Sequence, residues 1–241
     1  MRRCALPSPL SVEEITLPAT AQHYLCQVLR LKDGDLFIGF DGKGGERVFK
    51  LDENEGQWSA IAHGSVYQGK CGVPVALVYA IPKGDKLDQV ARQLTELGVS
   101  ELHLLTADRS IGLWKENKIQ TKLARLERVI KEAARQSGRA DCLTLFRPQK
   151  LPTLIDRHRD TSLKVFFDPN ATNGWPNLKQ QIRPANCVLL VGPEGGLSDT
   201  EISILQESGW IGVRLKSPIL RTETAALVTC TLAIDRLGYL A

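Results

Sequence analysis

The stretch CVLLVGPEGGLSDTEISILQESGWIGVRLKSPILRTETAA, residues 187–226, decides the fold of this chain. It begins with a short apolar run, residues 187–191, of the kind found in strands that are buried on both faces. The glycine-rich segment 192–196 follows directly, and glycine lets a backbone approach a ligand closely because it has no Cβ. Ser198 and Glu201 then form a capping-box pattern, which predicts that a helix begins there.

The second half of the stretch repeats this order. Another buried strand is expected at residues 211–215, the pair Ser217-Pro218 turns the chain, and a last helix is expected to begin near Thr222. Two loops therefore leave the same ends of two strands, which is where open α/β sheets bind their ligands.

Upstream of this stretch, the pattern predicts further units of a parallel sheet. An apolar strand at residues 75–80 precedes a helix that Asp85 begins and Gly98 ends, and the next strand is expected at residues 102–106. The strand–helix–strand order is typical of parallel pairing. Further strands are expected at 142–146 and 163–167, and weaker helices at 151–158 and 176–182.

The N-terminal part of the chain has a different character. Strands are expected at residues 36–40, 47–51 and 58–63, with a glycine turn between the first two and a short helix at 20–29 before them. Residues 66–73 form a candidate linker. The sequence thus predicts two domains, a β-rich module at residues 1–70 and an α/β domain at residues 73–241.

Positive charge is concentrated in the middle of the chain. The net charge of +4 arises from 31 Lys and Arg against 27 Asp and Glu, and residues 109–139 hold nine basic side chains against three acidic ones. A long helix is expected at residues 115–136, and its polar faces carry most of these bases. Such a charged helix is either a solvated face or a surface that contacts a nucleic-acid backbone.

Composition limits the other classes of function. The chain has 241 residues with 43% hydrophobic content, and no apolar run long enough to span a bilayer. Its N-terminus lacks the apolar region of a secretory signal. Six cysteines are scattered without a CxxC pair, so we expect reduced thiols in a cytoplasmic protein and no metal site.

Several motifs resemble those of one enzyme family. GPEGGLS at residues 192–198 and ILRTETAA at residues 219–226 resemble the 16S ribosomal RNA uridine-N3 methyltransferase family of the SPOUT class. HYLCQVLRLKDGD at residues 23–35 and the segment 86–110 are similar to the same family. EAARQSGR at residues 132–139 also matches its pattern, except that Arg135 replaces an acidic residue. Lys216 and Pro218 are further departures from the family pattern.

The resemblance implies a fold, a cofactor and partners. It implies an N-terminal PUA-like β-barrel that binds RNA, a SPOUT parallel sheet with a C-terminal trefoil knot, a homodimer, and S-adenosylmethionine as cofactor. The expected cofactor-binding residues are Phe167, Gly192, Glu194, Gly195, Gly196, Leu215, Ser217, Ile219, Leu220 and Ala225. The expected RNA-binding residues are Arg2, Arg3, His23, Arg30, Arg109, Gln136 and Arg139.

The implied reaction transfers a methyl group to N3 of a uridine in small-subunit ribosomal RNA, either free or in the assembled subunit. N3 must lose a proton, so the site has to stabilise the anionic base. Arg221 is the candidate for that role, and Glu223 either orients Arg221 or acts as the base. Two alternatives stay open: another SPOUT methylation of RNA, and a ribosome assembly factor that binds RNA without catalysis.

Overall fold

The structure, a computed structural model, describes residues 1–7, 9–175 and 184–240. The helix expected at residues 176–182 lies outside these described residues. The chain divides into two compact units. Unit 1 comprises Met1–Gly72 and Lys131–Cys142, and unit 2 comprises Val73–Ile130 and Leu143–Ala241. Unit 1 therefore contains a segment from the middle of the chain besides the N-terminal residues.

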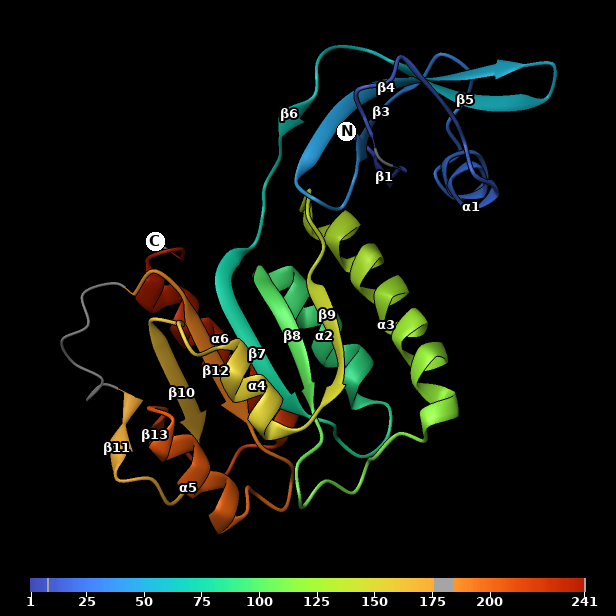
Figure 1. Ribbon diagram of the computed structural model, residues 1–241. Helices are drawn as coiled ribbons and strands as arrows, with labels where there is room; N and C mark the ends of the chain where they lie inside the picture. Colours follow the sequence, from blue (N-terminus) through green and yellow to red (C-terminus); the bar gives the residue numbers. More distant parts are fainter. Residues whose placement is uncertain (8, 176–183, 241) are drawn as a thin grey trace. The chain divides into compact units, whose positions relative to one another are not determined.

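Unit 2 is built on a seven-stranded parallel sheet, which confirms the predicted α/β class (Figure 1). Every neighbouring pair in it is parallel. In spatial order the strands are β11 (Asn173–Gly174), β13 (Ile211–Arg214), β10 (Leu163–Phe167), β12 (Cys187–Val191), β7 (Val73–Ala80), β8 (Val99–Leu105) and β9 (Thr144–Gln149).

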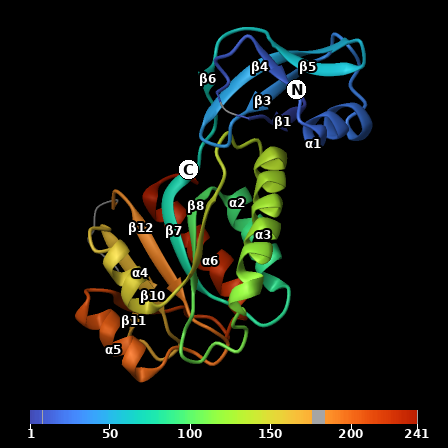
Figure 2. The same ribbon diagram turned by 45° about the vertical axis from the view of Figure 1, so that its right-hand side comes forward.

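Helices cover both faces of this sheet. Figures 1 and 2 show α4 (Leu151–Arg157) and α5 (Asp199–Glu207) on one face, and α2 (Lys86–Leu97) and α6 (Thr222–Leu237) on the other. Alternate residues of β7 serve the two faces. Val78 packs in the apolar cluster that includes Leu154 of α4, whereas the Tyr79 hydroxyl donates to Thr222 Oγ1 of α6 at 3.1 Å. Burial on both faces explains why the strands are continuous apolar runs.

Local end signals place the helices of unit 2 where the sequence predicts them. The backbone N–H of Glu201 donates to Ser198 Oγ at 3.2 Å, and the N–H of Ser198 donates to Glu201 Oε2 at 2.8 Å, which completes the capping box of α5. Gly98 ends α2 with a φ of 91°, a left-handed conformation that favours glycine. The long basic helix α3 spans Glu116–Ser137, within one residue of the prediction, and its residues from Lys131 onward belong to unit 1.

Unit 1 is rich in β-structure, as predicted. Its six strands are β1 (Arg3–Ala5), β2 (Glu14–Thr16), β3 (Leu36–Phe40), β4 (Gly45–Asn54), β5 (Gln57–Ala62) and β6 (Tyr67–Gln68). Their core includes Phe37 and Phe49, whose rings stack at 6.0 Å. The helix expected at residues 20–29 is a short α1 (Ala19–Gln22) that continues as a π-helix, His23–Val28.

None of the described helices is long and apolar enough to cross a membrane.

Candidate functional site

A cavity of about 750 Å³ opens at the carboxyl ends of β10, β12 and β13. These three strands are neighbours and parallel, so the segments that follow them emerge at one edge of the sheet. The volume is in the range of small-molecule sites, about 300–1,000 Å³. The cavity therefore lies where ligands bind in open α/β sheets.

The two loops recognised in the sequence form most of the cavity wall. We call residues 192–198 the glycine loop and residues 215–221 the proline loop. Of the ten expected cofactor-binding residues, the structure places nine along the cavity: Phe167, Gly192, Glu194, Gly196, Leu215, Ser217, Ile219, Leu220 and Ala225. The tenth, Gly195, instead lies against Arg109, whose Cβ would be 3.4 Å from an added Cβ.

Two glycines of the glycine loop have distinct structural requirements. Gly196 has a φ of 72°, which side chains rarely adopt. Gly192 lines the cavity with an ordinary φ, but a Cβ there would lie 3.1 Å from Cγ of the buried Leu197. The loop is thus packed tightly from within, and a Cβ at Gly192 would require the Leu197 side chain to shift by a few tenths of an ångström.

Side chains that follow β8 hold the glycine loop from outside. Arg109 Nη1 donates to the carbonyl oxygens of Gly195 at 3.3 Å and Leu197 at 3.1 Å. Ser198 Oγ donates to Asp108 Oδ2 at 2.7 Å, and the N–H of Asp108 donates to Glu201 Oε1 at 3.1 Å. Arg109, an expected RNA-binding residue, therefore fixes the glycine loop in this structure.

The proline loop is held much less. Ile219 is 88% exposed, although it lines the cavity. Among the described residues, the side chains of this loop make one hydrogen bond, from Ser217 Oγ to the carbonyl of Pro218 at 3.0 Å. Of the two departures from the family pattern here, Pro218 lines the cavity, while Lys216 is exposed outside its lining.

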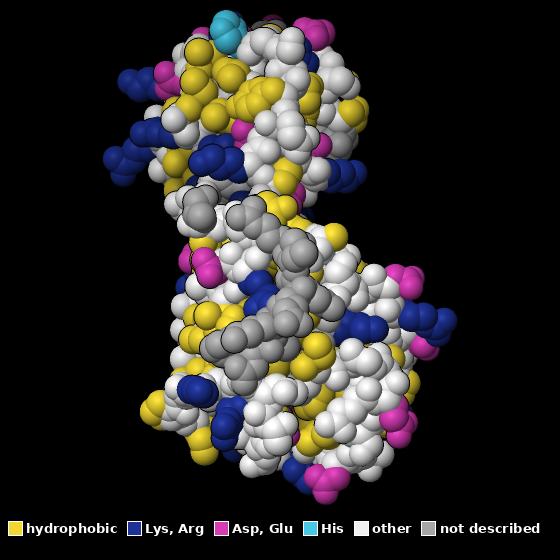
Figure 3. All heavy atoms as spheres, turned by 90° about the vertical axis from the view of Figure 1, so that its left-hand side faces the viewer, with side chains coloured by type: hydrophobic (Ala, Val, Ile, Leu, Met, Phe, Trp, Pro, Cys, Tyr) yellow, Lys and Arg dark blue, Asp and Glu magenta, His cyan; other side chains and the backbone are white. Residues whose placement is uncertain are grey.

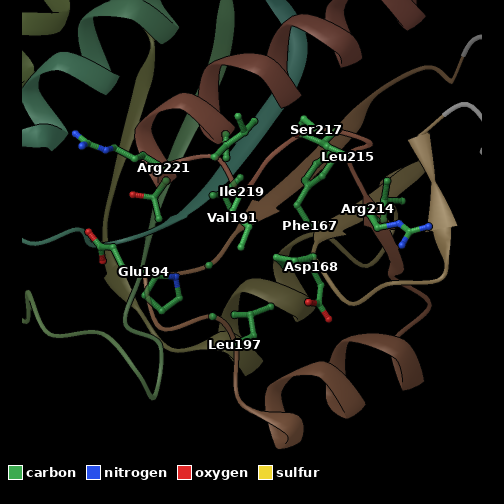
Figure 4. A pocket seen from close by; sticks show the side chains of 18 of the residues that line it. Phe167, Asp168, Val191, Glu194, Leu197, Arg214, Leu215, Ser217, Ile219 and Arg221 are labelled. Atoms are coloured by element: carbon green, nitrogen blue, oxygen red, sulfur yellow. The ribbon is translucent and has the colours of Figure 1, made fainter.

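The two expected catalytic residues lie at the start of α6. Arg221 is exposed, and in Figure 4 its side chain points away from the group formed by Val191, Leu215 and Phe167. Glu223 does not pair with Arg221 in the described structure. Its Oε2 accepts from Lys86 Nζ at 3.1 Å, and Lys86 also lies 3.8 Å from Glu194 Oε1.

These contacts set the charge of Glu223. Its burial raises the pKa of the carboxyl, but hydrogen bonds from its own backbone N–H, from Lys86 and from Thr222 outweigh this effect, so the pKa is lowered from the usual value. Glu223 is therefore a carboxylate at neutral pH and a weakened base.

The expected RNA-binding residues of unit 1 fall into two groups. Arg3 and Arg139 are held inside the unit. Arg3 pairs with Glu46 and donates to the Arg139 carbonyl at 2.9 Å. The buried Arg139 contacts both carboxylate oxygens of Asp141 at 2.9 and 3.0 Å. Four others are exposed: Arg2, His23, Arg30 and Gln136.

Arg135 shows what replaces the acidic residue of the family pattern. Its guanidinium carbon lies 3.9 Å from the centre of the Tyr24 ring, within cation–π range, and Arg135 also pairs with Glu132. A base at this position is thus accommodated by an aromatic ring and an acid of unit 1.

Sequence reasoning missed several residues of the cavity. Lys86 and Thr222 come from α2 and α6, and Asp168 directly follows β10. Leu197 and Arg214 also line it. The rule that ligands bind beyond strand ends identifies Asp168 and Arg214, but only the three-dimensional fold brings Lys86 to this edge.

Comparisons with known proteins agree with this architecture. Residues 69–234 match the model of the RNA methyltransferase domain, and residues 17–57 match that of the RNA methyltransferase PUA domain. The chain belongs to the RNA methyltransferase family, and the resemblance carried by GPEGGLS and ILRTETAA is confirmed.

Several of the similar proteins carry the same name. The ribosomal RNA small subunit methyltransferase E of Synechocystis is 32% identical, over 94% of this chain and 75% of that protein. The Aquifex aeolicus protein of that name is 33% identical, over 75% of this chain and 86% of its own length. The crystal structure of the Neisseria gonorrhoeae enzyme bound to S-adenosyl methionine is 27% identical with a TM-score of 0.85, covering 98% of this chain and 97% of that one.

Proposed function

We propose that this protein transfers the methyl group of S-adenosylmethionine to N3 of a uridine in 16S ribosomal RNA. The observation that carries the proposal is the cavity between the glycine loop and the proline loop, in a chain of the RNA methyltransferase family. The Neisseria gonorrhoeae relative holds S-adenosyl methionine. The choice of N3 rests on the resemblance of the two loop motifs.

The residues around the cavity fit this cofactor. Apolar side chains, among them Leu197, Leu215 and Leu220, suit the faces of an adenine ring. The carboxylates of Asp168 and Glu194 suit the positively charged amino group and sulfonium. The absence of a side chain at Gly192 keeps the cavity open beside Leu197. When bound, S-adenosylmethionine supplies an electrophilic methyl group.

The protein's own task is to make the uridine nucleophilic and to position it. Arg221 has an exposed guanidinium at the end of the proline loop, where it can stabilise negative charge on a uracil oxygen. Glu223 is occupied by Lys86 and has a lowered pKa, so we assign it to positioning Lys86 and Glu194 and not to removing the N3 proton. N3 takes part in base pairing, so the target nucleotide has to be unpaired or flipped out.

RNA recognition is assigned to the N-terminal segment of unit 1, as a PUA-like barrel spanning residues 1–70. Residues 73–241 are assigned to a SPOUT domain with a trefoil knot. On the face of unit 1 seen in Figure 3, Lys and Arg side chains (dark blue) lie beside hydrophobic ones (yellow). Exposed bases such as Arg2 and Arg30 suit phosphate contacts. The protein acts as a homodimer in the cytoplasm, on small-subunit RNA either free or assembled.

The test is methylation of RNA that lacks the modification. Small subunits and naked 16S RNA from a strain without the activity are incubated with the purified protein and S-adenosylmethionine. We expect N3-methyluridine in the digested RNA by mass spectrometry. A ribose-methylated or carbon-methylated nucleoside would overturn the N3 assignment. If neither RNA yields a product, the alternative of a protein that binds RNA without catalysis is favoured.

Arg221→Ala tests the assigned role directly. Removing one donor to a developing oxyanion typically costs about 10²–10³ in kcat. We expect that loss with unchanged cofactor affinity, because the Arg221 side chain points away from the centre of the cavity (Figure 4). The matched control is Arg214→Ala, which removes an exposed cavity arginine from another strand end. Equal losses in both variants would contradict a specific role for Arg221.

A further inference from the structure

A second cluster of chemically capable side chains lies in unit 2, outside the cavity. Glu101 and His103 are two positions apart on β8, so their side chains leave the same face of the sheet. His158 ends α4, which packs against β8 on that face. One ligand atom from each of the three side chains lies within 4.8 Å of the others.

Aromatic packing fixes the two imidazole rings. The His103 ring stacks on Phe146 of β9 with centroids 4.1 Å apart and planes within 9°. The His158 ring meets His103 edge-on, at 4.7 Å and 88°. His103 Nε2 lies 2.7 Å from Glu101 Oε2. The three side chains are thus already oriented toward one another, which reduces the ordering needed to bind an ion.

One ring nitrogen that can face an ion shared by this cluster has no partner among the described residues. It is the buried His158 Nε2. The buried His103 Nδ1 is also unpartnered, but the nitrogen of His103 that can share an ion with Glu101 is Nε2. His103 and His158 are 0% and 6% exposed. A buried polar atom without a partner costs free energy, and native structures usually supply one in the form of a side chain, a water or an ion.

We propose that Glu101, His103 and His158 form a binding site for a divalent transition metal ion of the zinc class. Two imidazoles and one carboxylate are a ligand set that Zn²⁺ uses, with a water in the fourth position. Mg²⁺ and Ca²⁺ prefer all-oxygen sites, so the two histidines disfavour them. The Glu101 side chain is 39% exposed while that of His103 is 0% exposed, so the ion enters and keeps its water on the Glu101 side.

This site is separate from the proposed methyl-transfer chemistry. None of its three residues lines the cavity. Its effect would be to tie the end of α4 to β8, since His158 and the other two ligands come from different elements. The expectation of no metal site rests on the scattered cysteines. It does not consider this cluster, because His158 lies far along the chain from Glu101 and His103, without a recognisable ligand spacing.

The experiment is a titration of the full-length, untagged protein with Co²⁺, followed by competition with Zn²⁺. We expect one Co²⁺ per chain, with visible bands typical of nitrogen and oxygen ligands, that Zn²⁺ displaces. His158→Phe, which retains an aromatic ring against His103, should abolish these bands. Glu101→Gln, at a partly exposed position, should weaken the affinity by at least about tenfold.

Matched controls use the other two histidines of the chain. His23 and His63 are both exposed in unit 1, so His23→Phe and His63→Phe should bind Co²⁺ as the unchanged protein does. Zn²⁺ should also raise the thermal midpoint of the unchanged protein. The same shift in Glu101→Gln should need a higher Zn²⁺ concentration, and His158→Phe should show no shift. Circular dichroism establishes that each variant is folded.

Three results would overturn the proposal. The first is the absence of visible bands in the folded, unchanged protein. The second is a sulfur-to-cobalt charge-transfer band, which would place the ion on a cysteine. The third is unchanged affinity in Glu101→Gln, which does not depend on whether His158→Phe folds. Methylation activity is not part of this test, so its outcome is independent of the proposed function.

Discussion

The glycine loop and the proline loop border one cavity but are held in different ways. The glycine loop is fixed by Arg109 and Asp108 and filled from within by the buried Leu197. The proline loop leaves Ile219 88% exposed, and its side chains make one hydrogen bond within the described structure. The glycine loop is therefore a preformed wall of the site, whereas the proline loop is a loosely held one.

This difference divides the energetics of binding between the two walls. A preformed wall gives specificity without an ordering cost, whereas a loosely held segment loses conformational freedom when a ligand orders it. The exposed Ile219 offers apolar surface that only a bound ligand can cover. We therefore expect changes in the glycine loop to obstruct binding and changes in the proline loop to weaken it.

The largest loss of cofactor affinity is expected from Gly192→Val. The new Cβ would lie 3.1 Å from Leu197 Cγ in a loop that is held on both sides, and overpacking of this kind costs about 1–3 kcal/mol. S-adenosylmethionine affinity, measured by calorimetry, should fall roughly 10- to 100-fold. Gly195→Ala is the control, because Gly195 lies outside the cavity lining. Normal binding by Gly192→Val would mean that the glycine loop yields as easily as the proline loop.

A smaller effect is expected from Ile219→Ala. The lost apolar area is covered only when the cofactor binds, so affinity should fall about fivefold to tenfold while the thermal midpoint of the free protein stays unchanged. Ile111→Ala removes a similarly exposed isoleucine, 75% exposed, away from the cavity and should change neither quantity. A lowered thermal midpoint in Ile219→Ala would contradict a loosely held proline loop.

The smallest effect is expected from Arg109→Ala. It removes an exposed hydrogen bond to the carbonyl of Gly195 and a partly buried one to the carbonyl of Leu197, together worth about 1 kcal/mol. Cofactor affinity should fall about threefold to fivefold. Arg128→Ala, an exposed arginine of α3, is the matched control. If both variants bind alike, Asp108 and Leu197 are enough to hold the glycine loop.

Much of unit 2 was predictable because its signals are local. The capping box of Ser198 and Glu201, the left-handed Gly98 and the apolar runs of β7 and β12 each depend on residues close together in sequence. The same is true of the two loop motifs, whose spacing pointed to a site beyond the strand ends. These features specify their own conformation whatever the rest of the chain does.

The features that sequence reasoning missed depend on contacts between distant residues. The short strand β1 is defined by parallel pairing with β3, some 35 positions away. Lys86 reaches Glu223 only because α2 and α6 cover the same face of the sheet. The sequence does not distinguish Gly195 from the cavity-lining Gly192 and Gly196. In the fold, Arg109 lies beside Gly195. No local pattern encodes such pairs, since each requires the tertiary arrangement.

The position of β10 in the sheet has a consequence for the order of folding. β10 pairs with β12 on one side and with β13 on the other, although β13 is made last of the three. Because a chain emerges from the ribosome N-terminus first, both edges of the cavity cannot exist until the residues beyond 210 have been synthesised. Cofactor binding therefore requires β13 and the segment that follows it, and a product truncated before β13 lacks one wall of the cavity.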